Sequence, residues 1–185
     1  MHNKSMVSRI WPAGSRQERI KMNTSEIELL ERTRENAEIY FYKTRDEEIG
    51  RMLPSASATL EQALDAYDRT CLPGAASVGR SIYWRGQYIG DVWCYCINKG
   101  ETPNAMLSYC IFEKELWGRG IAAAAVRMFL EYARERFSLC SMGAFTYTDN
   151  AGSVRVLEKN GFVCRERFTE DGRESAYYEL SQIIF

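Results

Sequence analysis

Residues 109–162 constrain the fold of this chain more than any other segment. An apolar run at 105–112 predicts a strand, and a turn with two glycines follows it. Residues 120–136 carry apolar side chains at helical spacing with charged side chains between them, and 138–148 return to a strand pattern. A strand, a helix and a strand at this spacing predict a right-handed parallel crossover in an α/β protein.

The segments on either side of this crossover predict antiparallel pairs. Short polar turns separate runs with a period of two, which is typical of hairpins and meanders. Helices are expected at 35–46 and 60–69, with Thr59 as the N-cap of the second. A further helix is expected after Asn150, its N-cap, with Gly161 closing it in the left-handed conformation. We therefore expect a mixed, mostly antiparallel twisted sheet with flanking helices. The strands expected outside the crossover are 81–84, 88–97, 163–169 and 174–180, the last two joined by a turn at Asp171 and Gly172.

Composition limits the classes of protein that fit. The chain has 185 residues, of which 45% are hydrophobic and 26% charged, and this predicts one globular domain at 25–185 after a loose leader at 1–24. The net charge of −1 and the pI of about 6.0 argue against a nucleic-acid partner. The absence of a long apolar run argues against a membrane span or a signal peptide, so a cytoplasmic protein is expected.

The histidine and cysteine content argues against several kinds of active site. His2 is the single histidine, whereas Ser-His-Asp and Cys-His hydrolases and His-based metal sites need an internal one. None of the six cysteines forms a CxxC pair. Cys94 and Cys96 are expected to share one face of a strand, and most of the cysteines are expected to be small buried hydrophobes. No metal site is expected.

The glycine turn is a candidate anion site. The first N–H groups of a helix have no partner within the helix, and the helix dipole makes that end positive. Gly118 and Gly120 have no side chains that would keep a phosphate from the backbone. The turn therefore predicts a phosphorylated ligand over 118–122, although a plain strand-to-helix loop is the alternative. A nucleotide fingerprint would need a third glycine, where this chain has Ala123.

Two motifs in order resemble the GNAT superfamily of acetyl-CoA-dependent N-acetyltransferases. They are Trp-Gly-Arg-Gly-Ile-Ala at 117–122 and Asn-x-x-Ser-x-x-x-Leu-Glu-Lys-x-Gly-Phe at 150–162, and the second is most similar to the RimJ/RimL subgroup. The resemblance covers about 82–180. It implies a splayed parallel strand pair that admits the pantetheine arm of acetyl-CoA. The implied cofactor-binding residues are Tyr109, Cys110, Ile111, Phe112, Trp117, Gly118, Arg119, Gly120, Ile121, Ala122, Asn150 and Ser153.

The resemblance also implies direct attack of a neutral amine on the thioester. A backbone N–H near Ile111 or Phe112 would polarise the carbonyl oxygen. Many family members carry a tyrosine acid at the position of Leu157, so Ser153 is the candidate acid here. The candidate bases are Glu113, Glu115 and Asp91, and a water chain could serve instead.

We thus expect an N-acetyltransferase that acts on a primary amine, carried by a small molecule or a peptide N-terminus. The acceptor is expected to approach from the side of residues 35–69. A homodimer is compatible with this expectation. The alternative is a catalytically idle acyl-CoA-binding or sensing module, which the missing tyrosine at Leu157 favours.

Overall fold

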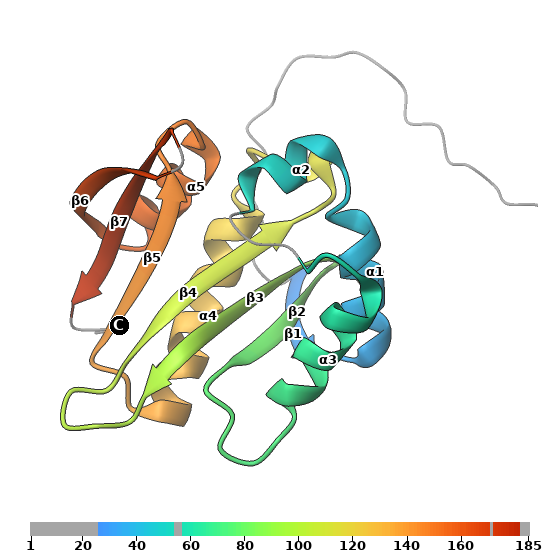
Figure 1. Cartoon of the computed structure of the whole chain (residues 1–185), viewed down its shortest axis with the longest axis horizontal. Helices are drawn as coiled ribbons and strands as arrows, with labels where there is room; N and C mark the ends of the chain where they lie inside the picture. The colour runs from blue at the N-terminus through green and yellow to red at the C-terminus, as the bar shows by residue number, and fades with distance from the viewer. Residues whose placement is uncertain (1–25, 54–56, 171, 182–185) are drawn as a thin grey trace, which may run out of the picture.

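A computed structural model describes residues 26–53, 57–170 and 172–181. Its centre is a seven-stranded sheet with the order β1-β2-β3-β4-β5-β7-β6 (Figure 1). Every neighbouring pair is antiparallel except β4 and β5, which are parallel, so the expected mixed sheet and its single crossover are confirmed. The strands are β1 (Ile27–Glu31), β2 (Val78–Trp84), β3 (Gln87–Asn98), β4 (Asn104–Ile111), β5 (Ser141–Tyr147), β6 (Val163–Glu170) and β7 (Arg173–Ser181).

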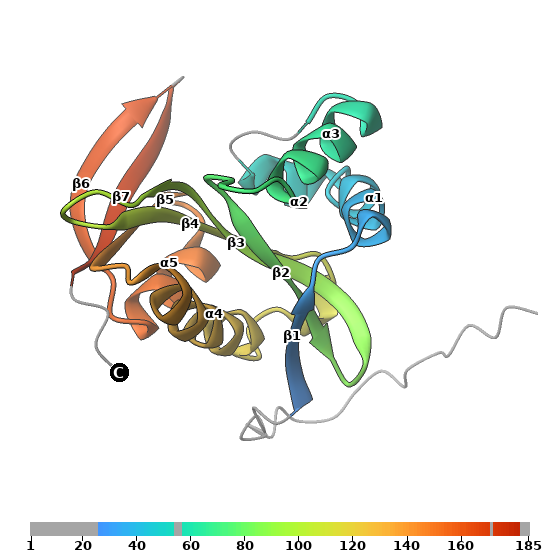
Figure 2. The ribbon, with the colours of Figure 1, turned by 90° about the horizontal axis from the view of Figure 1, so that it is seen from below.

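Helices cover both faces of the sheet. One face carries the three N-terminal helices, and the other carries the crossover helix and the helix that follows β5 (Figure 2). Among the described residues, none of the helices is long and apolar enough to cross a membrane. The helices are α1 (Arg34–Lys43), α2 (Glu47–Met52), α3 (Leu60–Thr70), α4 (Ile121–Phe137) and α5 (Ala151–Lys159), with the short 3-10 helix η2 (Lys114–Leu116) before α4.

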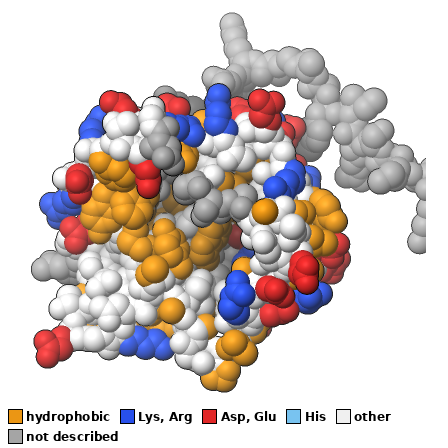
Figure 3. Space-filling view, in the orientation of Figure 1, with side chains coloured by type: hydrophobic (Ala, Val, Ile, Leu, Met, Phe, Trp, Pro, Cys, Tyr) orange, Lys and Arg blue, Asp and Glu red, His pale blue; other side chains and the backbone are white. Residues whose placement is uncertain are grey.

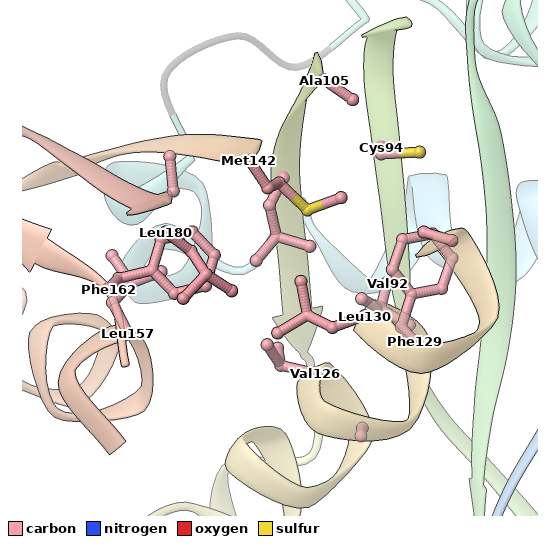
Figure 4. Close-up of a cluster of buried hydrophobic side chains, with 14 of the residues drawn as sticks. Val92, Cys94, Ala105, Val126, Phe129, Leu130, Met142, Leu157, Phe162 and Leu180 are labelled. Atoms are coloured by element: carbon pink, nitrogen blue, oxygen red, sulfur yellow. The ribbon is translucent and has the colours of Figure 1, made fainter. Parts of the chain in front are cut away.

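The main core lies between the sheet and α4. The apolar side chains that recur along α4 at helical spacing are buried against β3, β4 and β5, as their periodicity predicted (Figure 4). A second group, Leu157, Phe162 and Leu180, extends the core under α5. Fully burying one large aliphatic or aromatic side chain contributes about 1.5–3 kcal/mol, so this helix is held mainly by tertiary packing.

The parallel pair at the centre of the sheet is short. β4 and β5 pair only where Asn104–Met106 faces Ser141–Gly143, and beyond that point the two strands diverge (Figure 1). Gly143 lies at the divide, where a Cβ atom would come within 2.8 Å of the Met106 sulfur and 2.7 Å of the Tyr177 ring. The strand pair is therefore splayed, as the family resemblance implied.

Aromatic side chains gather on the outer face of β5, β6 and β7, where Figure 3 shows hydrophobic atoms at the surface. The ring of Phe145 is centred 5.9 Å from that of Phe168 and 5.1 Å from that of Tyr177. Phe145 is 51% exposed. Over β5, β6 and β7 this face of the sheet has no helix, because the three N-terminal helices lie over the other half of the sheet (Figure 2).

Two elements were missed by the sequence analysis. β1 was given no strand assignment because only Ile27 of this edge strand is buried, so the period-two pattern is weak. The helix expected at 35–46 is in fact two helices. Thr44 ends the first with its hydroxyl bonded to the Tyr40 carbonyl, and Asp46 caps the amides of Glu48 and Ile49 to begin α2.

The expectation for the cysteines was wrong in two ways. Cys96 has φ of 52° where the β3–β4 register shifts, and this irregularity turns it to solvent while Cys94 stays buried. The two thiols therefore do not share a face. Most of the cysteines are also not buried: Cys71, Cys96 and Cys140 are exposed, Cys164 is intermediate, and Cys94 and Cys110 are buried.

The expected turns are otherwise confirmed where they are described. Arg85 and Gly86 both have positive φ and join Trp84 to Gln87, which is a two-residue hairpin turn. Gly172 has φ of 77° before β7. Asp171 of the same turn, and the leader expected at 1–24, lie outside the described residues.

Candidate active site at the splayed strands

The glycine turn leads directly into α4. Gly118 and Gly120 have φ of 75° and 84°, a conformation that L side chains rarely adopt, and a Cβ atom on either would meet no atom within 4 Å. Gly120 is the N-cap and supplies no side-chain cap, so the amides of the first turn of α4 receive no side-chain acceptor. Arg119 between them is exposed. The turn presents uncapped donors beside open space, which suits an anion.

Trp117 fixes this turn to the end of β4. Its indole Nε1 donates to the carbonyl oxygen of Ile111 at 2.7 Å. The N–H of Phe112 donates to the Ile89 carbonyl at 3.0 Å, so this amide is already used. Because successive amides of a strand point to opposite edges, the N–H of Ile111 faces the side on which β5 has diverged. Of the two amides that sequence analysis named, Ile111 is the one on the open edge.

Gly90 of β3 allows the backbone of β4 to approach closely at Cys110 and Ile111, beside the candidate site. A Cβ atom at Gly90 would come within 2.1 Å of the carbonyl oxygen of Cys110, so only glycine fits here. The Cys110 side chain turns to the α1 face, and burial raises the pKa of its thiol to about 12. Cys110 therefore remains a protonated thiol at neutral pH. The sequence analysis did not single out Gly90, although a glycine inside a strand pattern often marks a close backbone approach.

Tyr109 and Ser153 come together on the α5 side of the opening. The Tyr109 hydroxyl lies 2.8 Å from Ser153 Oγ and also donates to the Ser153 carbonyl at 3.1 Å. Burial raises the pKa of Tyr109 above its usual value, opposed by the bond to Ser153, so the phenol stays protonated. Asn150 caps α5 through the amide of Ser153 at 3.0 Å, as its type predicted. The side-chain link from Tyr109 to Ser153 was not predicted.

The far end of α5 is tied to the start of α4. Asn160 Nδ2 donates to the carbonyls of Ala123 at 3.1 Å and Val156 at 2.8 Å, and Asn160 is buried. Gly161 takes the left-handed conformation, with Phe162 bonded back to the Leu157 carbonyl, so the expected C-terminal cap is confirmed. Asn160 thus positions the two helices that flank the opening, and the sequence analysis gave it no such role.

The three candidate bases differ in their surroundings. Asp91 is fully buried, paired with Arg32 at 2.7 Å and accepting from Ser81 and Tyr88, so its candidacy as a base that meets the substrate was wrong. Burial raises its pKa, and Arg32 opposes that effect. Glu113 lies at the end of β4 and accepts from Lys43 of α1 at 2.7 Å. Glu115 is exposed in η2.

A pocket of about 500 Å³ lies on the opposite face of the sheet, between α1, α3 and strands β3 and β4. Tyr40, Trp93 and Ser108 are among the residues in its wall. Within the described part of the chain, no group of three or more His, Cys, Asp or Glu side chains is placed to hold a metal ion.

The candidate active site consists of the glycine turn, the open edge of β4 and the pair Tyr109 and Ser153.

Comparison with known proteins agrees with this arrangement. Probable N-acetyltransferase YjcK of Bacillus subtilis (strain 168) is 38% identical over 74 residues, which is 40% of this chain and 40% of that protein. The match thus spans two fifths of the length of that relative. At this extent, the match alone assigns no substrate.

Solved structures share the fold over most of the chain. Spermidine N-acetyltransferase from Vibrio cholerae, in complex with CoA and spermine, has a TM-score of 0.74 at 18% identity and covers 85% of this chain and 96% of its own. RimL, the ribosomal L7/L12 alpha-N-protein acetyltransferase, in complex with coenzyme A, gives 0.73 at 14% over 86% and 96%. Aminoglycoside acetyltransferase AAC(6')-Ib in complex with coenzyme A gives 0.69 at 16% over 84% and 94%.

A family described as "Acetyltransferase (GNAT) domain" matches residues 27–163, from β1 to the start of β6. The match includes the glycine turn, the splayed pair and α5. This chain belongs to the GNAT acetyltransferase family.

Proposed function

We propose that this protein is an N-acetyltransferase of the RimJ/RimL type that moves the acetyl group of acetyl-CoA to a primary amine. The observation that carries the proposal is the opening between β4 and β5 beside an uncapped glycine turn. The family membership and the coenzyme A complexes of proteins with this fold support it. The motif at 150–162 and the likeness to RimL support the subgroup.

The residues present fit acetyl-CoA as cosubstrate. The amides from Gly118 to Ala122 would hold the pyrophosphate, because they lie at the positive end of α4 with open space over both glycines. The open edge of β4 from Tyr109 to Ile111 would pair with the amides of the pantetheine arm as a neighbouring strand does. Cys110 and Phe112, which sequence analysis included, would contribute backbone only, since their side chains are buried on the α1 face.

Different residues of the chain would then have different roles in acetyl transfer. The N–H of Ile111 polarises the thioester carbonyl as the amine nitrogen forms its bond to carbon. Ser153 donates a proton to the sulfur as the carbon–sulfur bond breaks, and solvent returns a proton to Ser153. Tyr109, which stays protonated and lies 2.8 Å from Ser153 Oγ, orients the Ser153 hydroxyl. A thiol of pKa about 8.5 needs only a mild acid. Glu113, once released from Lys43, takes the proton that the attacking nitrogen loses.

The idle acyl-CoA-binding module remains the second candidate, because Leu157 stands where many family members carry the tyrosine acid and is buried in the core. The pair Tyr109 and Ser153 supplies a hydroxyl donor by another route, and this favours an active enzyme.

Turnover and binding distinguish the two candidates. Thiol release from acetyl-CoA is measured with a panel of primary amines, and coenzyme A binding is measured by calorimetry on the same preparation. An active enzyme releases thiol only with an acceptor and yields an acetylated amine by mass spectrometry. Tight binding of coenzyme A without turnover of any amine would establish the idle module instead.

A homodimer of this chain stays a prediction, and sedimentation velocity measures whether the chain self-associates.

A further inference from the structure

The pocket between α1, α3 and the sheet has an unbalanced charge. Its wall includes the arginines Arg32, Arg45 and Arg69, and no Asp or Glu is among the described residues that line it. Its volume of about 500 Å³ is within the range of small-ligand sites. Such a wall repels a polycation and attracts an anion.

Arg32 is held rigidly at this wall. Its Nε donates to Asp91 Oδ2 at 2.7 Å, and Asp91 is fixed in turn by Ser81 and Tyr88. Tyr67 of α3 donates to the Arg32 carbonyl at 3.1 Å. The terminal nitrogens of Arg32 make no hydrogen bond to any described residue, and its side chain is 20% exposed. A pre-oriented guanidinium fork of this kind matches a carboxylate.

The other two arginines are exposed and add positive charge at the pocket. Arg45 stacks over the Phe41 ring at 4.1 Å and donates to the Ser57 carbonyl, but neither it nor Arg69 forms an ion pair within the described part of the chain. Asp68, the acidic neighbour of Arg69, is paired with Arg34. Even when Asp91 is set against Arg32, two positive charges remain at the pocket.

The pocket reaches the place where the sheet opens. Ser108 of β4 lines it, and the next residue is Tyr109, which contacts Ser153 from the other face. The last pair between β4 and β5 is Met106 with Gly143, so at Ser108 the sheet is already divided. A ligand in the pocket can therefore direct an amine toward the open edge of β4 without crossing a closed sheet.

We propose that this pocket binds the anionic part of the acceptor, so that the acceptor is a small primary amine that carries a carboxylate. The inference rests on the proposed function and narrows its substrate class. It sets this chain apart from proteins of the same fold whose structures hold spermine or paromomycin, which are polycations. Those amines would meet two arginines here that form no ion pair within the described residues.

The test uses pairs of amines that differ only in a carboxylate: lysine with cadaverine, and 4-aminobutyrate with propylamine. At saturating acetyl-CoA and constant pH, kcat/KM should be at least about tenfold higher for the carboxylate member, since one hydrogen bond to a charged group changes affinity by about that factor. Arg45→Gln and Arg69→Gln should bring the ratio close to one without changing coenzyme A affinity. Arg127→Gln, on the exposed side of α4, is the matched control and should keep the wild-type ratio.

Arg32 needs a milder change, because Arg32→Gln would leave Asp91 buried without its partner charge. Arg32→Lys keeps the charge but removes the fork, and it should lower the ratio while the protein stays folded by circular dichroism. Equal kcat/KM within each pair, or a preference for cadaverine or spermidine, would overturn the proposal.

Failure of the proposed function gives a different result. If no amine is turned over although coenzyme A binds, calorimetry with glutarate tests the pocket alone. Glutarate binding that Arg69→Gln abolishes and Arg127→Gln leaves intact supports an anion site. The absence of glutarate binding to the wild-type protein, in that case, overturns the pocket proposal as well.

Discussion

Replacing Gly120 by alanine tests whether the glycine turn binds phosphate, and Gly86→Ala is the matched control. Gly120 has φ of 84°, and a Cβ atom there meets nothing within 4 Å, so the added methyl group strains the backbone without a steric clash. Gly86 in the β2–β3 turn has φ of 75° and the same open surroundings, but it belongs to a hairpin turn that does not lead into a helix. The two substitutions therefore differ in location and share their local physics.

The effect on stability should be alike in both variants. Holding an L residue in the left-handed conformation costs about 1–2 kcal/mol relative to glycine. For a chain of this size, each kcal/mol lowers Tm by about 2–4 °C. Both variants should thus melt about 2–8 °C below the wild type, remain folded at 25 °C and show the same decrease within error.

The two variants should differ in their affinity for coenzyme A. In Gly120→Ala the methyl group occupies the open space over the turn where a phosphate oxygen would approach the amides of α4. Loss of one hydrogen bond to a charged group corresponds to about 1.5–3 kcal/mol, which is about a 10- to 150-fold higher Kd. Gly86→Ala should bind coenzyme A with the wild-type Kd.

Calorimetry with coenzyme A measures both affinities, and S-acetylpantetheine gives a further control. It lacks the pyrophosphate, so its kcat/KM should be the same in Gly120→Ala and the wild type. The reasoning is refuted if Gly120→Ala stays folded and binds coenzyme A as the wild type does. An equal loss of affinity in Gly86→Ala would also refute it, because strain alone would then explain the change.

Three further predictions concern the rest of the site. Ser153→Ala should lower kcat more than it lowers the affinity for acetyl-CoA. Asn150→Ala should weaken acetyl-CoA binding and cost about 1 kcal/mol of stability through the lost cap. A Ser153→Ala enzyme with the wild-type kcat would mean that solvent protonates the thiolate. Gly90→Ala should lower Tm by several degrees, because its Cβ would lie 2.1 Å from a backbone carbonyl oxygen and overpacking costs about 1–3 kcal/mol; an unchanged melting curve would contradict this contact. The pH profile of kcat/KM should rise as the acceptor amine loses its proton and should show no decline up to about pH 9.5, because the raised pKa of Tyr109 keeps the phenol protonated there. A flat profile from about pH 6 to 9 would argue against rate-limiting attack by the neutral amine.

Features that depend on neighbours in sequence could be predicted from the chain alone. The apolar stripe of α4, the cap at Asn150 and the left-handed Gly161 follow from side-chain spacing and from residue types with strong local preferences. The parallel crossover follows in the same way, because a strand, a helix and a strand of these lengths leave few ways to pack. The glycine turn was recognised because its backbone requirement appears directly as residue type.

Features that depend on contacts between distant segments were decided by the tertiary structure. Tyr109 and Ser153 are 44 positions apart and meet only because the divergence of β4 from β5 places α5 across the opening. The burial of Asp91 depends on Arg32, 59 positions away, and on the neighbouring strand β1. β1 could not be assigned from the sequence because its period-two pattern is weak. A sequence shows that a carboxylate or a hydroxyl is present. Whether it reaches a ligand or is sealed into the core depends on which strands and helices pack around it, because burial and charge pairing are properties of that packing.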